Sequence, residues 1–316
     1  MSKLNSLIKI IKYEKKELPW AIYRNLAIMG VTNFIPDTIH LKICYRLACG
    51  KKLDLKNPKT FNEKIQWLKL NNHKDEYTIM VDKYEAKKYV ANKIGYEHII
   101  PTLGVWNRFD DIDFNELPEQ FVLKCTHDSG GLVICKDKKN LDIAKARKKI
   151  NTSLKRNFYY FGREWPYKNV KPRIIAEKYM ENRMNANQEN NGLVDYKIWC
   201  ANSIPIMILV CSNRFSESGL SEDFYDIDWN HLDIKRPRHD NPNIIYSRPQ
   251  RLDEMLHFSK VLAQDIPFVR VDFYEINGNI YFGELTFSPA SGFERFVPDS
   301  MDMKLGKNIK LETKNE

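Results

Sequence analysis

Apolar residues recur at helical spacing in several stretches of the chain. One such stretch follows a turn at Asn57-Pro58, where Thr60 and, three residues later, Glu63 fit a helix capping box. The region 57–101 is therefore expected to be mostly helical. Further helices are expected within residues 1–50, with loops near Pro19 and Pro36, and at 141–157 and about 252–264.

Short apolar runs with turn residues between them predict strands elsewhere. The clearest is a hairpin around Asn277-Gly278, a favoured two-residue turn. The stretch 222–250, rich in Pro, Asp, Asn and His, is predicted to be loop. The expected strands cover 121–126, 131–136, 172–180, 195–201, 204–211, 269–275 and 280–287.

These turns indicate antiparallel pairing rather than the regular alternation of a doubly wound parallel sheet. The chain contains neither GxGxxG nor GxxxxGK[ST], so a Rossmann or P-loop nucleotide site is not expected. With 316 residues, 43% of them hydrophobic, the chain can bury two or three subdomains. The predicted fold class is α+β.

Positive charge is concentrated at one end of the chain. Residues 1–60 hold ten Lys and two Arg against four acidic residues, which accounts for nearly all of the net charge of +9. A basic end suggests an anionic membrane surface, an acidic glycan or nucleic acid as partner, or simply a solvated surface. No nucleic-acid-binding motif is present, so nucleic acid is not the expected partner.

Six cysteines are present without CxxC or zinc-ligand spacing, and Lys and Glu interrupt every early apolar run. A cytoplasmic protein with reduced thiols is expected. Near the N-terminus, apolar residues lie among lysines at a roughly helical period, which fits either an interfacial membrane helix or a docked terminal helix. They are Leu4, Leu7, Ile8, Ile10 and Ile11.

Candidate chemistry begins at the first predicted hairpin. Strand alternation places Lys124 on the face opposite Leu123 and Cys125, where it can reach a cleft. The turn that follows offers two glycines, a hydroxyl and main-chain N–H groups, which can bind phosphate oxygens. An ordinary hairpin with an exposed lysine has the same pattern. The turn comprises His127, Asp128, Ser129, Gly130 and Gly131.

The last predicted hairpin carries two carboxylates. Arg270 and Asp272 share a face of one strand, and Glu284 and Thr286 share a face of the other. Two facing carboxylates repel each other unless a cation lies between them, and oxygen ligands suit Mg²⁺. Arg270 could hold a phosphate or carboxylate in a bidentate contact. The alternative is an exposed, charged hairpin face.

The order of these features resembles the ATP-grasp superfamily: a lysine strand, a glycine turn, Glu177-Lys178-Tyr179-Met180, a strand lysine, then Arg-x-Asp with a distal Glu. Several segments together are similar to the TupA-like ATP-grasp family, tied to teichuronopeptide, capsule and other bacterial surface-polysaccharide loci. They are LKNPKTFNEKIQWLKL, VDKYEAKKYV, FVLKCTHDSGG, GREWPYKNVKPRIIAEKYM, DYKIWCANS and GELTFSPASGF, within about residues 38–310.

This resemblance implies ATP and Mg²⁺ as cofactors, bound between two lobes. It implies that Lys124 and the turn 127–131 bind phosphate, that 177–180 forms the adenine hinge, and that Glu181 or Asp195 binds the ribose. Lys197, Arg214 and Arg270 would be catalytic. The metal ligands would be Asp272, Glu284 and Thr286; Thr286 stands where many ATP-grasp enzymes have Asn.

The implied activity is an ATP-dependent carboxylate–amine ligase that joins an acidic sugar, glycan or sugar nucleotide to an amine or amino acid. A glycosyltransferase is the alternative, for which Asp226-Ile227-Asp228 would be the DxD motif. Peripheral association of the basic N-terminus with the inner face of the membrane is a further expectation. The expected segments are a basic helical extension at 1–50, an N-terminal region at 51–118, a lid at 119–176 and a C-terminal subdomain at 177–316.

Overall fold

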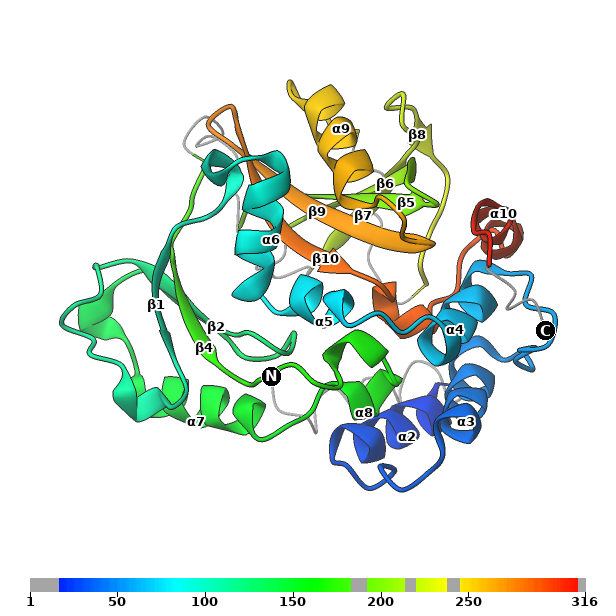
Figure 1. The fold of residues 1–316 in the computed structure, drawn as a ribbon, viewed down its shortest axis with the longest axis horizontal. Coiled ribbons are helices and arrows are strands. Elements are labelled where there is room, and N and C mark those ends of the chain that lie inside the picture. The colour runs from blue at the N-terminus through cyan, green and yellow to red at the C-terminus, as the bar shows by residue number, and fades with distance from the viewer. Residues whose placement is uncertain (1–16, 183–191, 214–219, 238–244, 312–316) are drawn as a thin grey trace.

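The computed structural model describes residues 17–182, 192–213, 220–237 and 245–311. The expected apolar helix at Leu4–Ile11 and the candidate Arg214 lie outside these residues. Two antiparallel sheets and a set of helices make up the fold (Figure 1). No helix of the described residues is long and apolar enough to cross a membrane. All six cysteines are buried free thiols.

The smaller sheet has four strands in the order β1-β4-β2-β3. Its strands are β1 (Thr102–Trp106), β2 (Phe121–Cys125), β3 (Leu132–Cys135) and β4 (Ile174–Lys178). Along β2 the side chains alternate as predicted: Phe121, Leu123 and Cys125 are buried and pack with Ala146 and Ile150 of helix α7 (Ile143–Leu154). Val122 and Lys124 therefore point to the opposite face of the sheet, away from α7.

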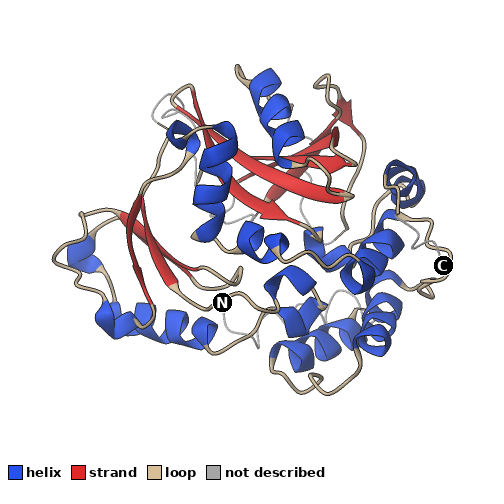
Figure 2. Ribbon diagram, in the orientation of Figure 1, coloured by secondary structure: helices blue, strands red, loops and turns tan. Residues whose placement is uncertain are grey.

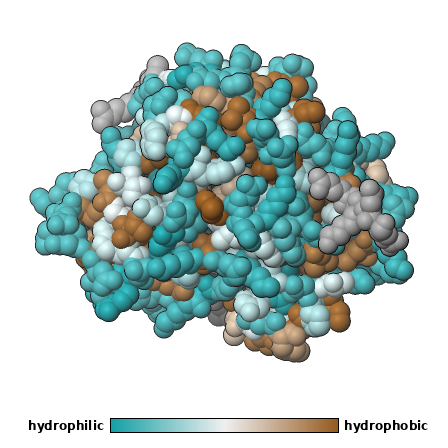
Figure 3. Space-filling view, viewed as in Figure 1, coloured by the Kyte–Doolittle hydropathy of each residue, from teal (hydrophilic) through white to brown (hydrophobic). Residues whose placement is uncertain are grey.

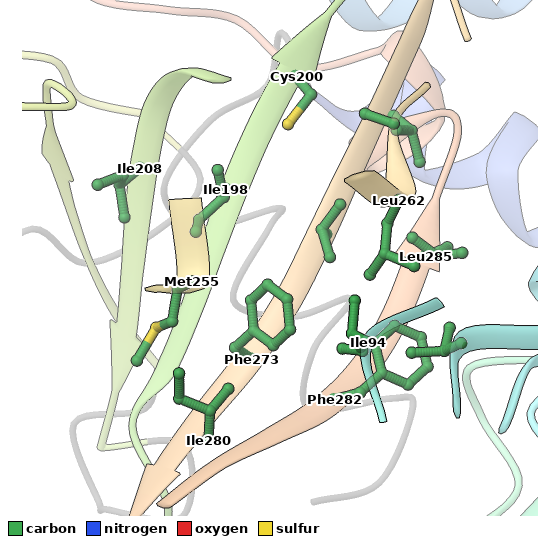
Figure 4. Packing of buried hydrophobic residues seen from close by; sticks show 14 of the residues in the cluster. Ile94, Ile198, Cys200, Ile208, Met255, Leu262, Phe273, Ile280, Phe282 and Leu285 are labelled. Carbon is green, nitrogen blue, oxygen red and sulfur yellow. The ribbon is translucent and has the colours of Figure 1, made fainter. Parts of the chain in front are cut away.

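The larger sheet has six strands in the order β10-β9-β5-β6-β7-β8. They are β5 (Asp195–Ala201), β6 (Ile204–Ser212), β7 (Ser221–Tyr225), β8 (His231–Leu232), β9 (Phe268–Ile276) and β10 (Asn279–Thr286). Helices α6 (Glu85–Ile94) and α9 (Leu252–Leu262) pack on this sheet. Figure 4 shows Met255 and Leu262 of α9 beside Ile198 and Phe273 in the resulting core.

The remaining helices lie below and beside the larger sheet (Figure 2). The predicted capping box is confirmed: Thr60 Oγ1 accepts from Glu63 N at 3.2 Å, and Glu63 Oε2 accepts from Thr60 N at 3.0 Å. Pro19 lies in a first helical turn rather than in the expected loop, since proline suits that position. The helices are α2 (Leu18–Ile28), α3 (Asp37–Cys49), α4 (Phe61–Asn71), α5 (Glu76–Val81), α8 (Tyr159–Gly162) and α10 (Ser300–Asn308).

The predicted hairpins at 121–136, 195–211 and 269–287 are confirmed, and Asn277 and Gly278 both have positive φ. The prediction of loop throughout 222–250 is wrong, because β7 and β8 fall in or overlap this stretch. The residues of β7 are mostly polar, so this strand did not match the apolar pattern used to predict strands. Glu222 is buried in a bidentate ion pair with Arg236, a contact between residues remote in sequence.

Asp226-Ile227-Asp228 forms the turn between β7 and β8. Asp226 Oδ1 accepts hydrogen bonds from the main-chain N–H groups of Asp228 at 3.0 Å and Asn230 at 2.8 Å. The carboxylate therefore closes a turn, which accounts for the DxD pattern without a metal.

The smaller sheet takes strands from both sides of the expected segment boundaries, whereas all strands of the larger sheet fall within 177–316. β1 lies within 51–118 yet pairs with β4 in the smaller sheet, and β4 itself runs across residue 177. The smaller sheet is thus assembled from strands that are distant in sequence, with α5 and α6 between it and the larger sheet in Figure 1.

Candidate active site

A cavity of about 690 Å³ lies between the two sheets. Both sheets contribute to its wall: β2 through Val122 and Lys124, β5 through Asp195 and Lys197, and β9 through Asp272. Thirteen of the residues predicted to bind ATP or metal, or to be catalytic, line this cavity, both ribose-binding candidates among them. They are Lys124, Asp128, Ser129, Gly131, Glu177, Lys178, Tyr179, Met180, Glu181, Asp195, Lys197, Asp272 and Glu284.

Glu177 is the centre of a buried ion triad in the cavity wall. Its two carboxylate oxygens accept from Lys87 Nζ at 2.6 Å and from Lys124 Nζ at 2.5 Å. Burial alone would raise the pKa of Glu177, but Lys124 and Lys87 outweigh it and lower the pKa to about 2. Burial lowers the pKa of Lys124, and Glu177 more than reverses this. Glu177 and Lys124 are therefore both charged at neutral pH.

The segment after β4 offers main-chain groups to the cavity. The sheet pairing ends at Lys178, whose N–H donates to the Pro101 carbonyl at 3.0 Å. Within the described residues, the main chains of Tyr179 and Met180 make no hydrogen bond to protein. Apolar side chains line the same cavity, so a flat heterocycle could bind there with its edge against this segment. They are Ile99, Ile100, Val122, Leu132, Ile134, Val194 and Phe282.

The turn after β2 is held by its own side chains. Asp128 Oδ1 accepts from Gly131 N at 3.0 Å, and Ser153 of α7 donates to the other oxygen. Lys83 Nζ donates to the Asp128 carbonyl at 2.5 Å, which ties the turn to the start of α6. Ser129 is exposed at the cavity mouth. Contacts from Gly131, Ser153 and Lys83 thus hold the turn in place, while Ser129 at its tip stays accessible to a ligand.

Four side chains of β9 and β10 form a compact network around Arg270. The register pairs Asp272 with Glu284 and Arg270 with Thr286. Arg270 Nε donates to Asp272 Oδ1 at 2.6 Å, while Nη2 donates to Glu284 Oε1 at 2.9 Å and Thr286 Oγ1 at 3.0 Å. The guanidinium is thus the cation that holds the two carboxylates together, with Lys197 also paired to Asp272.

Glu284 stays ionised in this network. Burial would raise its pKa, but Arg270, Lys197 and Lys83 lower it to about 2. A β-bulge at Gly283 brings Glu284 opposite Asp272, and a Cβ at Gly283 would lie only 3.1 Å from the Asp272 carbonyl oxygen. Glycine suits this position because the two main chains approach closely.

The carboxylates fit a magnesium ion shared with phosphate groups. Within the described residues no three His, Cys, Asp or Glu side chains gather in a metal-binding group. Both oxygens of Asp272 already accept from Arg270, and Glu284 accepts through Oε1, while its Oε2 makes no hydrogen bond within the described residues. Mg²⁺ is commonly bound by one or two carboxylates together with substrate phosphates, so the chemistry of these oxygen donors suits it.

A second cavity, of about 820 Å³, adjoins the first. The two share Lys83, Ser129 and Glu284, so Glu284 stands where they meet. Arg270 and Thr286 line the second cavity instead of the first. Its far wall is formed by α2 and by residues 288–295. Aromatic side chains contribute to the lining, namely Trp20, Phe158, Phe161, Tyr167 and Phe293.

Glu164 is a buried acid in the wall of the second cavity. Ser291 donates to its Oε1, and burial raises its pKa although Lys69 opposes this. Lys69 is buried as well and donates to the Ser291 carbonyl at 2.6 Å. Burial lowers the pKa of Lys69 to about 8, with Glu164 acting in the opposite direction.

Two predicted site residues do not reach either cavity. His127 is buried, and its Nε2 lies within hydrogen-bond distance of the Ser153 carbonyl at 3.2 Å and the Arg156 carbonyl at 3.1 Å, so it fastens the turn to α7. Gly130 lines neither cavity and is exposed. Strand alternation could not reveal this, because neither residue belongs to a strand.

Lys83 and Lys87 were missed by sequence reasoning, although both line the first cavity. They are four residues apart in the segment VDKYEAKKYV and so fall on one side of the helical turn. That spacing was the available signal. It was masked by Lys88 in the same segment, which is exposed and does not line the cavity.

Comparison with solved structures gives weak overall similarities. A D-alanine–D-alanine ligase from Helicobacter pylori is 16% identical with a TM-score of 0.40, covering 80% of this chain and 70% of that one. The ATP complex of the Bacillus anthracis enzyme is 17% identical with a TM-score of 0.38, covering 66% of this chain. The ATP-grasp ligase PsnB is 9% identical with a TM-score of 0.39, covering 72%.

The chain spans only about half the length of two of these proteins, 55% of the Bacillus enzyme and 57% of PsnB. No curated protein matches the chain. The family comparison is decisive, because the model described as TupA-like ATPgrasp matches residues 63–310, which include both sheets and the whole lining of the first cavity. The chain therefore belongs to the TupA-like ATP-grasp family.

Proposed function

We propose that this protein is an ATP-dependent carboxylate–amine ligase that works through an acyl-phosphate intermediate. The observation that carries the proposal is the meeting of two cavities at Glu284, with Arg270 and Thr286 on the side away from the first cavity. One cavity has the size and lining for a nucleotide. The other can hold an acid and an amine close to the nucleotide's terminal phosphate.

In the first step, a carboxylate oxygen of the acid attacks the terminal phosphorus of ATP, and the bond from that phosphorus to ADP breaks. Lys124 and Lys197 neutralise phosphate charge from the cavity wall. Arg270 faces the second cavity and holds the acyl phosphate. Asp272 and Glu284, with Thr286 alongside, would hold Mg²⁺, which supplies charge neutralisation at the transferred group.

In the second step, the amine attacks the acyl carbon, inorganic phosphate leaves and the nitrogen loses a proton. Glu164 lines the second cavity, and its Oε2 makes no hydrogen bond within the described residues. This carboxyl group is placed to accept a hydrogen bond from the amine, which would orient the nucleophile. Exclusion of water by the aromatic wall would protect the acyl phosphate from hydrolysis.

The proposed acid is a uronic-acid-containing sugar, glycan or sugar nucleotide used in bacterial surface-polysaccharide synthesis of the capsule or teichuronopeptide kind. The family membership supports this class. The mixed lining of the second cavity also supports it, since aromatic rings and charged groups together suit a hydroxylated acidic sugar. We propose that the reaction takes place in the cytoplasm, at the inner face of the membrane.

The test is to incubate the protein with Mg-ATP, glucuronate or galacturonate, and glutamate or another amine, and to measure ADP, phosphate and the amide product. ADP that forms only when both acceptors are present supports the ligase. Release of a nucleoside diphosphate from a UDP-sugar without ATP would instead show a glycosyltransferase. Asp272→Asn and Glu284→Gln should abolish ADP formation; full activity in both would remove them as metal ligands.

A further inference from the structure

Large apolar side chains are exposed in one part of the N-terminal helical region. Met29 is 72% exposed and Phe34 is 84% exposed, both in the loop between α2 and α3. Val31 is exposed in the same loop, and three more exposed apolar residues lie in the two flanking helices. We name these six the α2–α3 apolar surface: Ile22, Leu26, Met29, Val31, Phe34 and Ile39.

The α2–α3 apolar surface is continuous along α2 and its loop. Ile22, Leu26 and Met29 follow each other by four and three residues, which places them on one helical stripe. The opposite stripe carries the buried Trp20 and Ala27. The loop lies at the lower edge of Figure 1, and Figure 3 shows brown and tan atoms gathered at that edge. Soluble surfaces normally carry large apolar residues singly, so a cluster marks a contact surface.

The charges around this surface are almost all positive. Between Leu18 and Leu53 the single acidic residue is Asp37, which binds Arg163 Nε at 3.1 Å and accepts from the Tyr159 hydroxyl. The basic residues of this segment are Arg24, Lys42, Arg46, Lys51 and Lys52, of which Lys51 is paired with Asp299 at 2.6 Å. Residues 1–17, which precede it, add five Lys against two Glu.

This combination selects one kind of partner. Two copies of the surface would bring like charges together, which opposes self-association. An anionic lipid bilayer offers the complementary charge, and its headgroup region accepts apolar side chains that project from a loop. We propose that the α2–α3 apolar surface docks on anionic membranes, with the loop side chains Met29, Val31 and Phe34 entering the interface.

Docking in this way would place the second cavity beside the bilayer. Helix α2 lines that cavity with Trp20 and Arg24, while its other stripe belongs to the α2–α3 apolar surface. An acceptor carried by a membrane lipid could then enter the cavity without leaving the surface. Docking itself does not depend on the ligase proposal, because it can be measured without ATP or acceptor.

The experiment is co-sedimentation of the full chain with vesicles of phosphatidylcholine alone or mixed with phosphatidylglycerol. The wild type should bind the mixed vesicles and release as salt is raised. Met29→Asp with Phe34→Asp should weaken binding by about tenfold or more, because two apolar side chains no longer enter the interface. The matched control is Ile204→Asp with Ile245→Asp, since Ile245 is also 84% exposed and lies outside the surface.

Binding that is lost in the first double variant and kept in the control supports the proposal. Absence of wild-type binding to mixed vesicles overturns it, and so does equal binding by both double variants. A wild-type dimer in solution that dissociates in the Met29/Phe34 variant also overturns it, because the surface would then be an interface between copies. ADP formation measured on the same samples is a separate readout, so failure of the ligase proposal cannot be mistaken for failure of docking.

Discussion

Replacing Glu177 with glutamine should destabilise the protein by about 3 kcal/mol. Glu177 is only 5% exposed and accepts from two lysines, so glutamine would leave Lys87 and Lys124 as neighbouring, partly buried like charges. The magnitude follows from the pKa of Glu177 of about 2. Against about 4.3 for a glutamate in water, this corresponds to about 3 kcal/mol in favour of the ionised carboxylate. Loss of one partner from other buried ion pairs costs about 3–5 kcal/mol.

The measurement is urea unfolding at pH 7 of the wild type, Glu177→Gln, Lys87→Met and the double variant. The double variant should be more stable than the two single losses predict, because removing Lys87 relieves the repulsion that Glu177→Gln creates. Glu116→Gln serves as control, since this glutamate is exposed, and should change stability by less than about 0.5 kcal/mol. The buried triad would be refuted if the stability losses of the two single variants simply added up in the double variant. It would also be refuted if Glu177→Gln lowered the free energy of unfolding by less than about 1 kcal/mol.

The stability difference between the wild type and Glu177→Gln should depend on pH. The folded pKa of Glu177 lies below the unfolded value, so its contribution is fully present above about pH 4.3 and is lost as the pH falls towards 2. The stability difference between wild type and Glu177→Gln should therefore shrink over this acid range. A difference that stays constant from neutral pH to the acid limit would show that Glu177 is not held ionised by the lysines.

Three further predictions concern other parts of the molecule. The pKa of Lys69 is lowered to about 8 in the folded protein, so between about pH 8 and pH 10 the folded lysine has lost its proton while the unfolded one still carries it. The stability of the wild type should therefore rise relative to that of Lys69→Met over this range. A stability difference in urea unfolding that does not change with pH would contradict this prediction. Gly306→Ala should lower the free energy of unfolding by more than about 2 kcal/mol, because a Cβ would overlap the main chain of Lys59 and Thr60. Gly50→Ala should lower it by about 1 kcal/mol, since Gly50 has a φ of 72° but open space around it. Equal losses of stability in thermal unfolding would contradict the tight packing of α10 on α4. Arg270→Lys should lower the rate of ADP formation by about a hundredfold or more, because a lysine cannot contact Asp272, Glu284 and Thr286 together; a rate within about tenfold of wild type would argue against its catalytic role.

The sequence by itself determined the local elements. Alternation in 121–125 showed which face of β2 carries Lys124, and Asn277-Gly278 identified the hairpin that pairs Asp272 with Glu284. The capping box at Thr60 also needs no distant contact. Such features depend on side-chain periodicity and turn geometry within a few residues, so they can be predicted from the sequence alone. The TupA-like family could likewise be recognised from the order of its motifs, and the family match over 63–310 confirmed it.

Tertiary structure decided which charged groups meet. Nothing near Glu177 in the sequence indicates that Lys87, ninety residues earlier, shares its carboxylate, or that Arg270 occupies the space between Asp272 and Glu284. β7 pairs with β6 and β8 although it buries Glu222, whose charge is met by Arg236, and His127 points to α7 because the turn packs there. Ion pairs and cavities join residues that are distant in the chain, so their strength comes from burial that only the assembled fold creates.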